Sequence, residues 1–315
     1  MLSGRATSPN GTPLETSMHR NLAAAFILTT LAGTPATAQR PIKVFISVDM
    51  EGITGVVSPE QLGPEGFEYQ RFREFMTAEA LAAIEGAREA GATQFVVADS
   101  HGNMQNLLID RFPTDVTIIR GGNRPLSMMH GIDSTFSAAM FIGYHSATTN
   151  MQGVRAHTMS SATFAGVYLN GRPIAESGMN AAIAGSVGVP VVLVSGDESA
   201  VGEVRTLLGD VEGAVVKHSI GFHSAATMTP AAGQALIKER ARAAITRLRE
   251  FKPHRVNGPY TLDIVYKNYL PAEVMALLPG IERRDAHTIR YSAQSVRDVS
   301  RFLVFSTSYR SDLTP

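Results

Sequence analysis

The sequence predicts an α/β protein: a mostly parallel sheet with flanking helices and an inserted hairpin, followed by a smaller C-terminal α+β domain. Three observations point to this fold class. Short β-rich apolar runs alternate with helical patterns after Arg40, an Asn170-Gly171 turn signal interrupts the alternation, and the composition changes after Lys217. We expect an N-terminal extension with a signal peptide over residues 1–39, an α/β domain over residues 40–217 and an α+β domain over residues 218–315.

Five apolar runs predict strands, because each is bounded by Gly, Asp, Asn or Ser. They are Lys43–Val48, Gln94–Ala98, Val116–Ile119, Ala138–Ile142 and Val191–Val194. Between the first two, the pattern predicts a helix that stops at Gly91, a residue suited to end one. The apolar residues near helical spacing are Phe72, Phe75, Met76, Leu81 and Ile84. A strand, a helix and a second strand in this order indicate parallel pairing.

The later part of the chain does not continue the simple alternation of strands and helices. Asn170-Gly171 between "GVYL" and "RPI" predicts a hairpin, and the small residues from Glu176 to Gly185 predict a tightly packed helix. Residues Thr229–Glu250 form a long amphipathic pattern typical of a helix. The segments "YTLDIVY", "PAEVMALLPG", "HTIRYSAQ" and "SVRDVSRFLVFST" then predict a strand-helix-strand-helix series.

Composition limits the possible partners and chemistry. The 28 Lys and Arg balance the 28 Asp and Glu of this 315-residue chain, so no net field attracts nucleic acid or an anionic membrane. The chain has no cysteine, which excludes disulfides, thiolate zinc sites and a thiol nucleophile. A metal site would therefore draw on carboxylates and the nine histidines.

The N-terminal region has the pattern of an export signal. From Met18 it offers a short basic start, an apolar stretch too short to span a bilayer comfortably, and the small-x-small pattern Ala36-Thr37-Ala38. We expect cleavage before Gln39 and a periplasmic or secreted mature protein that is not held in the membrane.

Metal-capable side chains stand directly after three predicted strands. Asp49 and Glu51 follow the first, His101 of "DSHGN" follows the second, and His145 of "GYHS" follows the fourth. Ligands of open α/β sheets bind outside the carboxyl ends of the strands, so these side chains should meet at one edge. Because residues i and i+2 of an extended chain point to the same side, Asp49 and Glu51 should aim at one point.

Each of these residues also has an ordinary explanation. Acids after a strand can form a solvated turn, "DSH" can be a turn, and the helix dipole alone favours Glu176 at the start of a helix. Their joint placement is what favours a metal site. Two His and three carboxylates suit two divalent ions if Asp49 bridges them, and the set fits zinc without excluding manganese or cobalt.

His157, in "RAHTMSS", has two readings. It is either a structural histidine or a proton donor and oxyanion partner beside the metals. The remaining histidines show no comparable placement and are expected to be structural or exposed: His130, His218, His223, His254 and His287.

Six motifs in order, "SVDMEGITG", "DSHGNMQNL", "FIGYHS", "AHTMS", "NGRPIAESGMNA" and "VVLVSGDE", resemble the DppA-like zinc D-aminopeptidases. The resemblance covers the chain from about Lys43 to Gly221 and implies two zinc ions per subunit, a decamer of two stacked pentamers, and removal of N-terminal D-residues, especially D-alanine, from short peptides. The residues that it implies as zinc ligands are Asp49, as the bridge, Glu51, His101, His145 and Glu176. It also implies that His157 is catalytic.

The working hypothesis is therefore a metallo-aminopeptidase with two zinc ions about 3.5–4 Å apart and a bridging hydroxide as nucleophile. Two alternatives stay open. One is another two-metal hydrolase such as a phosphoesterase, which calls for basic residues near the site; Arg120, Arg124 and Arg155 are the candidates. The other is a non-enzymatic exported protein that binds metal or small solutes.

Overall fold

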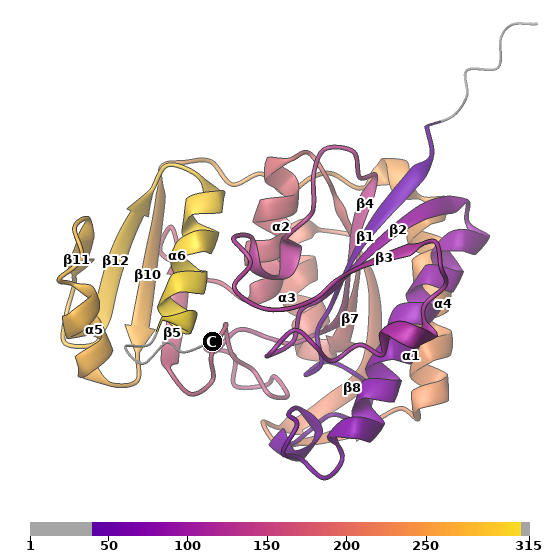
Figure 1. Ribbon diagram of the computed structural model, residues 1–315, viewed down its shortest axis with the longest axis horizontal. Coiled ribbons are helices and arrows are strands. Elements are labelled where there is room, and N and C mark those ends of the chain that lie inside the picture. Colours follow the sequence, from indigo (N-terminus) through magenta and orange to yellow (C-terminus); the bar gives the residue numbers. More distant parts are fainter. Residues whose placement is uncertain (1–39, 310–315) are drawn as a thin grey trace, which may run out of the picture. The chain divides into compact units, whose positions relative to one another are not determined.

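The computed structural model describes residues 40–309, and its main feature is a seven-stranded sheet in the order β3-β2-β1-β4-β7-β8-β9 (Figure 1). Its strands are β1 (Ile42–Val48), β2 (Ala92–Asp99), β3 (Val116–Ile119), β4 (Ala138–Tyr144), β7 (Val191–Asp197), β8 (Glu212–Gly221) and β9 (Ser224–Thr227). All neighbours pair in parallel except β8 and β9. Every residue of β4 and β7 is buried, as expected for central strands with both faces covered.

Helices cover both faces of this sheet (Figure 1). On one face, α1 (Tyr69–Glu89) and α4 (Pro230–Thr246) pack against each other and against the apolar side chains of β1. They approach each other closely at Gly86, where an added Cβ would lie 2.1 Å from the Lys238 carbonyl oxygen. On the other face lie α2 (Glu176–Ser186) and α3 (Glu198–Leu208).

A second, antiparallel sheet has the order β11-β12-β10-β5-β6. Its strands are β5 (Phe164–Leu169), β6 (Arg172–Pro173), β10 (Tyr260–Tyr266), β11 (Ile281–Arg283) and β12 (Thr288–Ala293). Helices α5 (Tyr269–Met275) and α6 (Val296–Ser308) belong to this part, and one apolar core continues from β4 and α2 into it. Short 3₁₀ helices occupy Pro59–Gln61, Ile109–Arg111, Ser127–Met129 and Leu248–Glu250.

The predicted fold class is confirmed, and the five predicted strands are all present. The hairpin is also present: Asn170 and Gly171 form its turn with φ values of 51° and 77°. We expected the hairpin as an insert in the α/β domain. It belongs instead to the second sheet, where β5 pairs with β10. This pairing joins residues far apart in the sequence, which local patterns do not encode.

The boundary expected at residues 217–218 does not separate the two sheets, because β5 and β6 of the second sheet come before it in the sequence. The boundary itself falls inside β8, and α4 beyond it packs on α1 against the large sheet. The described residues from Pro41 onward belong to one compact unit. The predicted signal peptide lies outside the described residues.

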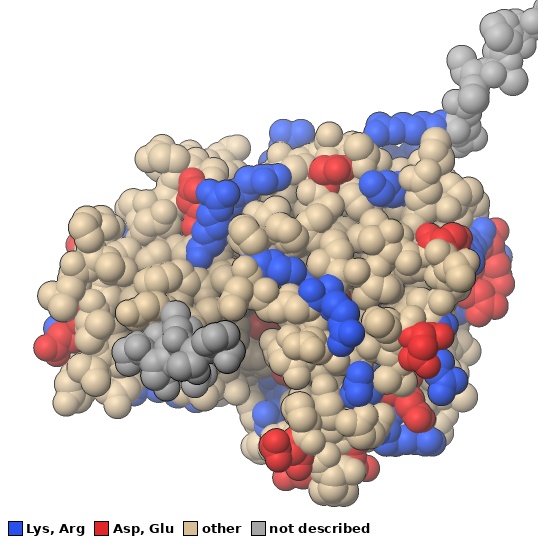
Figure 2. Space-filling view, viewed as in Figure 1, with Lys and Arg blue, Asp and Glu red and all other residues tan. Residues whose placement is uncertain are grey.

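The described residues show no membrane-spanning helix, and the face seen in Figure 2 shows no large charged patch. None of their helices is long and apolar enough to cross a bilayer. Figure 2 shows Lys, Arg, Asp and Glu interspersed over the visible face, without a broad patch of one sign. This distribution agrees with the balanced charge of the chain.

Candidate metal centre

The five predicted ligand residues converge at the carboxyl ends of β1, β2 and β4 and the first residue of α2. None is more than 7% exposed. They are Asp49 and Glu51 after β1, His101 after β2, His145 after β4 and Glu176 at the start of α2. The edge of the sheet predicted to carry the site is therefore the edge where these side chains meet.

The side chains form two overlapping groups whose ligand atoms lie within 4.8 Å of one another. Asp49, Glu51 and His101 make the first group, and Asp49, His145 and Glu176 make the second. Asp49 belongs to both. This arrangement is what a bridging carboxylate between two cations requires.

The ligand atoms within the two groups lie close together, and two of them make no hydrogen bond within the described residues. His101 Nδ1 lies 2.9 Å from Glu51 and 3.3 Å from Asp49, and His145 Nε2 lies 3.3 Å from Asp49 Oδ2 and 3.6 Å from Glu176. Within residues 40–309, Asp49 Oδ2 and His145 Nε2 are buried and make no hydrogen bond. Buried polar atoms are normally paired, so these two fit a bound cation.

The other ring nitrogens of the two histidines are held by backbone carbonyls. His101 Nε2 lies 2.7 Å from the Leu62 oxygen, and His145 Nδ1 lies 3.0 Å from the Ser146 oxygen. An N–H at each of these positions donates to the carbonyl and directs the lone pair of the other nitrogen into the cluster. Metal-ligating histidines commonly have such a partner, which fixes the tautomer and the ring orientation.

Electrostatics in the cluster favour protons or cations. Burial, and then the charge of Glu51, raise the pKa of Asp49. Burial also acts to raise the pKa of Glu51, but His101 outweighs it and holds that pKa well below its usual value. The pKa values of His101 and His145 are raised well above the usual value because the surrounding carboxylates overcome the effect of burial. Metal binding must displace these protons, so metal affinity should fall as the pH falls.

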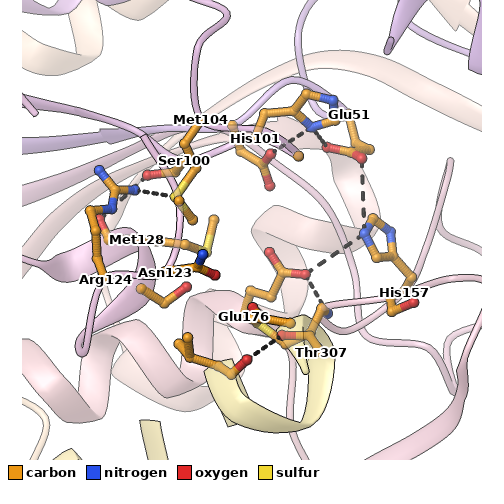
Figure 3. Close-up of a pocket in the computed structure, with 18 residues that line it drawn as sticks. Glu51, Ser100, His101, Met104, Asn123, Arg124, Met128, His157, Glu176 and Thr307 are labelled. Atoms are coloured by element: carbon orange, nitrogen blue, oxygen red, sulfur yellow. Dashed lines mark hydrogen bonds and ion pairs between the residues drawn. The ribbon is translucent and has the colours of Figure 1, made fainter. Parts of the chain in front are cut away.

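His157 faces the cluster from a loop (Figure 3). Its Nε2 lies 3.9 Å from Glu51 and 3.8 Å from Glu176, and its ring stacks on His145 at a centroid distance of 4.0 Å. Its Nδ1 lies 2.8 Å from the Arg155 carbonyl oxygen, so an N–H there leaves Nε2 free to exchange a proton. His157, Glu51 and His145 also form a third group with metal-ligand spacing.

The backbone that aims Asp49 and Glu51 differs from the prediction. We expected an extended chain, but β1 ends at Val48 and the chain turns. The amide of Gly52 donates to the Gly143 carbonyl at 2.7 Å. A Cβ on Gly52 would lie 2.0 Å from the Tyr144 carbonyl oxygen, so glycine allows this close approach. The two acids converge because the turn packs against the end of β4.

A cavity of about 300 Å³ opens beside the cluster (Figure 3). Asp49, Glu51, His101, His157 and Glu176 line one side of it. The rest of its wall includes the side chains Met104, Asn123, Arg124, Met128, Met159, Val304 and Thr307. Thus α6, at the end of the described chain, contributes to the same cavity as the turn after the first strand.

Sequence reasoning missed three parts of this site. The α6 wall carries no local signal, because only the tertiary fold places it there. A buried network of polar side chains beneath the cluster joins the Tyr144 hydroxyl to the Ser47 hydroxyl at 2.7 Å and to the Asn180 amide at 2.8 Å. Lys217 was also missed, although a single cation in the apolar run "AVVKHS" is a recognisable signal.

Fold and site together define a class: an α/β protein that gathers carboxylates and histidines at the carboxyl ends of parallel strands in a candidate two-metal centre. The D-aminopeptidase family of peptidases matches residues 42–305, and the chain belongs to this family. The family predicted from the six motifs is therefore confirmed.

Two relatives show the extent of the similarity. A D-aminopeptidase of Bacillus subtilis (strain 168) is 34% identical over 270 residues, which cover 84% of this chain and 97% of that protein. The solved structure of the zinc-dependent D-aminopeptidase DppA from Bacillus subtilis, described as a self-compartmentalizing protease, matches with a TM-score of 0.79 and 33% identity. That match covers 85% of this chain and 100% of the solved chain.

Proposed function

We propose that this protein is a zinc-dependent D-aminopeptidase that removes N-terminal D-residues of the D-alanine type from short peptides. The observation that carries the proposal is the pair of ligand groups that share Asp49 beside a small cavity. Membership of the D-aminopeptidase family supports the reaction, and the zinc-dependent relative supports the metal. We propose that Asp49, Glu51 and His101 hold one zinc ion and that Asp49, His145 and Glu176 hold the second.

The residues divide the chemical work between them. Bound zinc supplies a Lewis acid and lowers the pKa of water toward neutrality. His157 is the proposed proton-transfer residue, because Nδ1 is held by the Arg155 carbonyl and Nε2 faces the cavity. There it can stabilise charge on the substrate's carbonyl oxygen or give a proton to the leaving amine.

The cavity favours a peptide over a phosphate ester. Arg124 is the one Lys or Arg among the described residues that line it. Its guanidinium donates to the Asp99 carbonyl at 2.7 Å and to the Ile119 carbonyl at 3.3 Å. Arg155, another of the three candidates, stacks on Phe222 at 4.8 Å outside the lining, and Arg120 does not line the cavity either. A phosphoryl group would lack the free cations that usually stabilise it.

A panel of D- and L-aminoacyl dipeptides tests the proposal, assayed with wild-type, metal-stripped and zinc-restored protein. We expect hydrolysis of D-Ala peptides, loss of activity after stripping and recovery with zinc. Phosphate esters serve as control substrates. Activity that survives stripping would contradict the metal mechanism, and turnover of a phosphate ester without turnover of any D-peptide would contradict the proposed reaction.

We also propose that the protein is exported and assembles into a homodecamer. The export proposal comes from the pattern between Met18 and Ala38, and the assembly proposal from the family resemblance and the self-compartmentalizing relative. Protein recovered from the native host should have the mass of a chain that begins at Gln39. Analytical ultracentrifugation should give ten times that mass; a full-length cytoplasmic monomer would contradict both proposals.

A further inference from the structure

A buried lysine lies beneath the turn that carries Asp49 and Glu51. Lys217, on β8, is 1% exposed. Its Nζ donates to the backbone carbonyls of Glu51 at 2.5 Å, Val56 at 2.7 Å and Ile53 at 3.1 Å. An ammonium group has three N–H donors, and these three carbonyls match them in number.

The partners of Lys217 are unusual for a buried charge, which is normally paired with an opposite charge. Within the described part of the chain, its ammonium hydrogen-bonds to carbonyl oxygens of one turn and to no carboxylate. Asp197, Glu79 and Glu51 act on its charge through space. The ammonium therefore serves as a fixed cation around which the turn folds.

The peptide group after Glu51 is held at both ends. Its carbonyl oxygen accepts from Lys217, and its amide, that of Gly52, donates to the Gly143 carbonyl at 2.7 Å. Further along the turn, the Thr54 amide donates to Glu79 at 2.9 Å. With this peptide plane fixed, the direction in which the Glu51 side chain leaves the backbone is fixed as well.

The strand beside Lys217 holds the second loop of the site. Asp197 lies opposite Lys217 in the register of β7 and β8. Its carboxylate accepts a hydrogen bond from the Val154 amide at 2.8 Å. Val154 lies three residues before His157 in the loop between β4 and β5. The two facing residues thus hold the turn of Glu51 and the loop of His157 from one position at the sheet edge.

We propose that Lys217 is a positioning residue that aims Glu51 at the metal position shared with Asp49 and His101. The inference rests on the proposed zinc centre, but it concerns a residue outside the ligand set. It predicts that loss of the ammonium group weakens one metal position more than the other. His145 and Glu176, which form the second position with Asp49, lie on other elements.

Lys217→Met tests this inference, because methionine keeps most of the side-chain length and removes the charge. Zinc binding to metal-stripped protein is measured by calorimetry, and the absorption spectrum is recorded with cobalt in place of zinc. We expect the affinity of one of the two positions to fall about 10- to 100-fold, the size of effect seen when groups that orient metal ligands are lost. When zinc is limiting, kcat should fall together with this affinity, while KM stays close to the wild-type value.

Lys238→Met is the matched control. It also removes a lysine charge, but Lys238 pairs with Glu85 and Glu89 between α4 and α1. The Lys238→Met protein should bind zinc at both positions with wild-type affinity and should keep the wild-type kcat. A Lys217→Met protein with the same two affinities as Lys238→Met would overturn the inference.

Lys217→Ala with added propylammonium covers the case in which Lys217→Met does not fold. The truncation leaves space for three carbons and an ammonium group, which propylammonium supplies. We expect propylammonium, but not 1-propanol, to restore folding and the weakened zinc position. Equal rescue by both compounds would show that Lys217 only fills space and would overturn the inference.

Wild-type protein in the same series separates this inference from the proposed function. If the wild type binds no zinc or hydrolyses no D-peptide, the proposed function fails. If the wild type does both and Lys217→Met matches it, only the role of Lys217 fails.

Discussion

Replacing Asp49 with alanine is expected to remove both zinc ions and to lower turnover of D-Ala peptides by more than about 100-fold. The reason is that Asp49 is the residue common to both ligand groups, so its loss removes a ligand from each. Zinc content after gel filtration and kcat measure the effect. Glu51→Gln and Glu176→Gln should each weaken one position, because each of these residues belongs to one of the two groups that share Asp49.

Asp115→Ala is the control for the loss of an acid. Asp115 is exposed and pairs with Arg88 at 2.6 Å, so its replacement should leave zinc content and turnover unchanged. An Asp49→Ala protein that still holds two zinc ions, or that retains wild-type turnover, would contradict the shared-carboxylate arrangement.

Replacing His157 with alanine is expected to lower kcat about 100-fold or more while two zinc ions stay bound. The physical reason is that Nε2 of His157 faces the cavity and can exchange a proton there. The proposed set of zinc ligands is complete without His157. Steady-state kinetics on a D-Ala dipeptide and the zinc content of the same preparation test both parts of this prediction.

His218→Ala is the matched histidine control. Its side chain is 68% exposed and lies 3.8 Å from Glu198, away from the cavity lining. This variant should keep wild-type kcat. A His157→Ala protein that loses zinc would instead assign His157 to the third ligand group, with Glu51 and His145. Wild-type turnover with both ions bound would rule out the catalytic role.

The central strands and the residues that follow them could be predicted because their signals are local. The run before His145 is apolar and buried over its whole length, and the run before Asp49 is apolar except for Lys43 and Ser47; such runs are typical of strands buried on both faces. Once the sheet is taken as parallel, its carboxyl edge follows from topology. Residues from three strands could therefore be assigned to one site before their distances were known.

The remaining features depend on contacts between distant parts of the chain. The pairing of β5 with β10 is set by the burial of a shared apolar layer, so the hairpin signal at Asn170 could not reveal its partner strand. The role of Lys217 depends on β8, which brings it under a turn that lies 161 to 166 residues earlier in the sequence. The prediction that Asp49 and Glu51 aim at one point assumed an extended backbone, whereas the chain turns there.

The contribution of α6 to the cavity wall has a consequence for how the enzyme is made. All six proposed zinc-binding and catalytic residues lie between Asp49 and Glu176, whereas Val304 and Thr307 are among the last described residues to leave the ribosome. The proposed metal-binding and catalytic residues are therefore all synthesised before α6, the last helix of the described residues. A nascent chain that stops short of α6 carries all six of them but lacks one wall of the proposed peptide pocket.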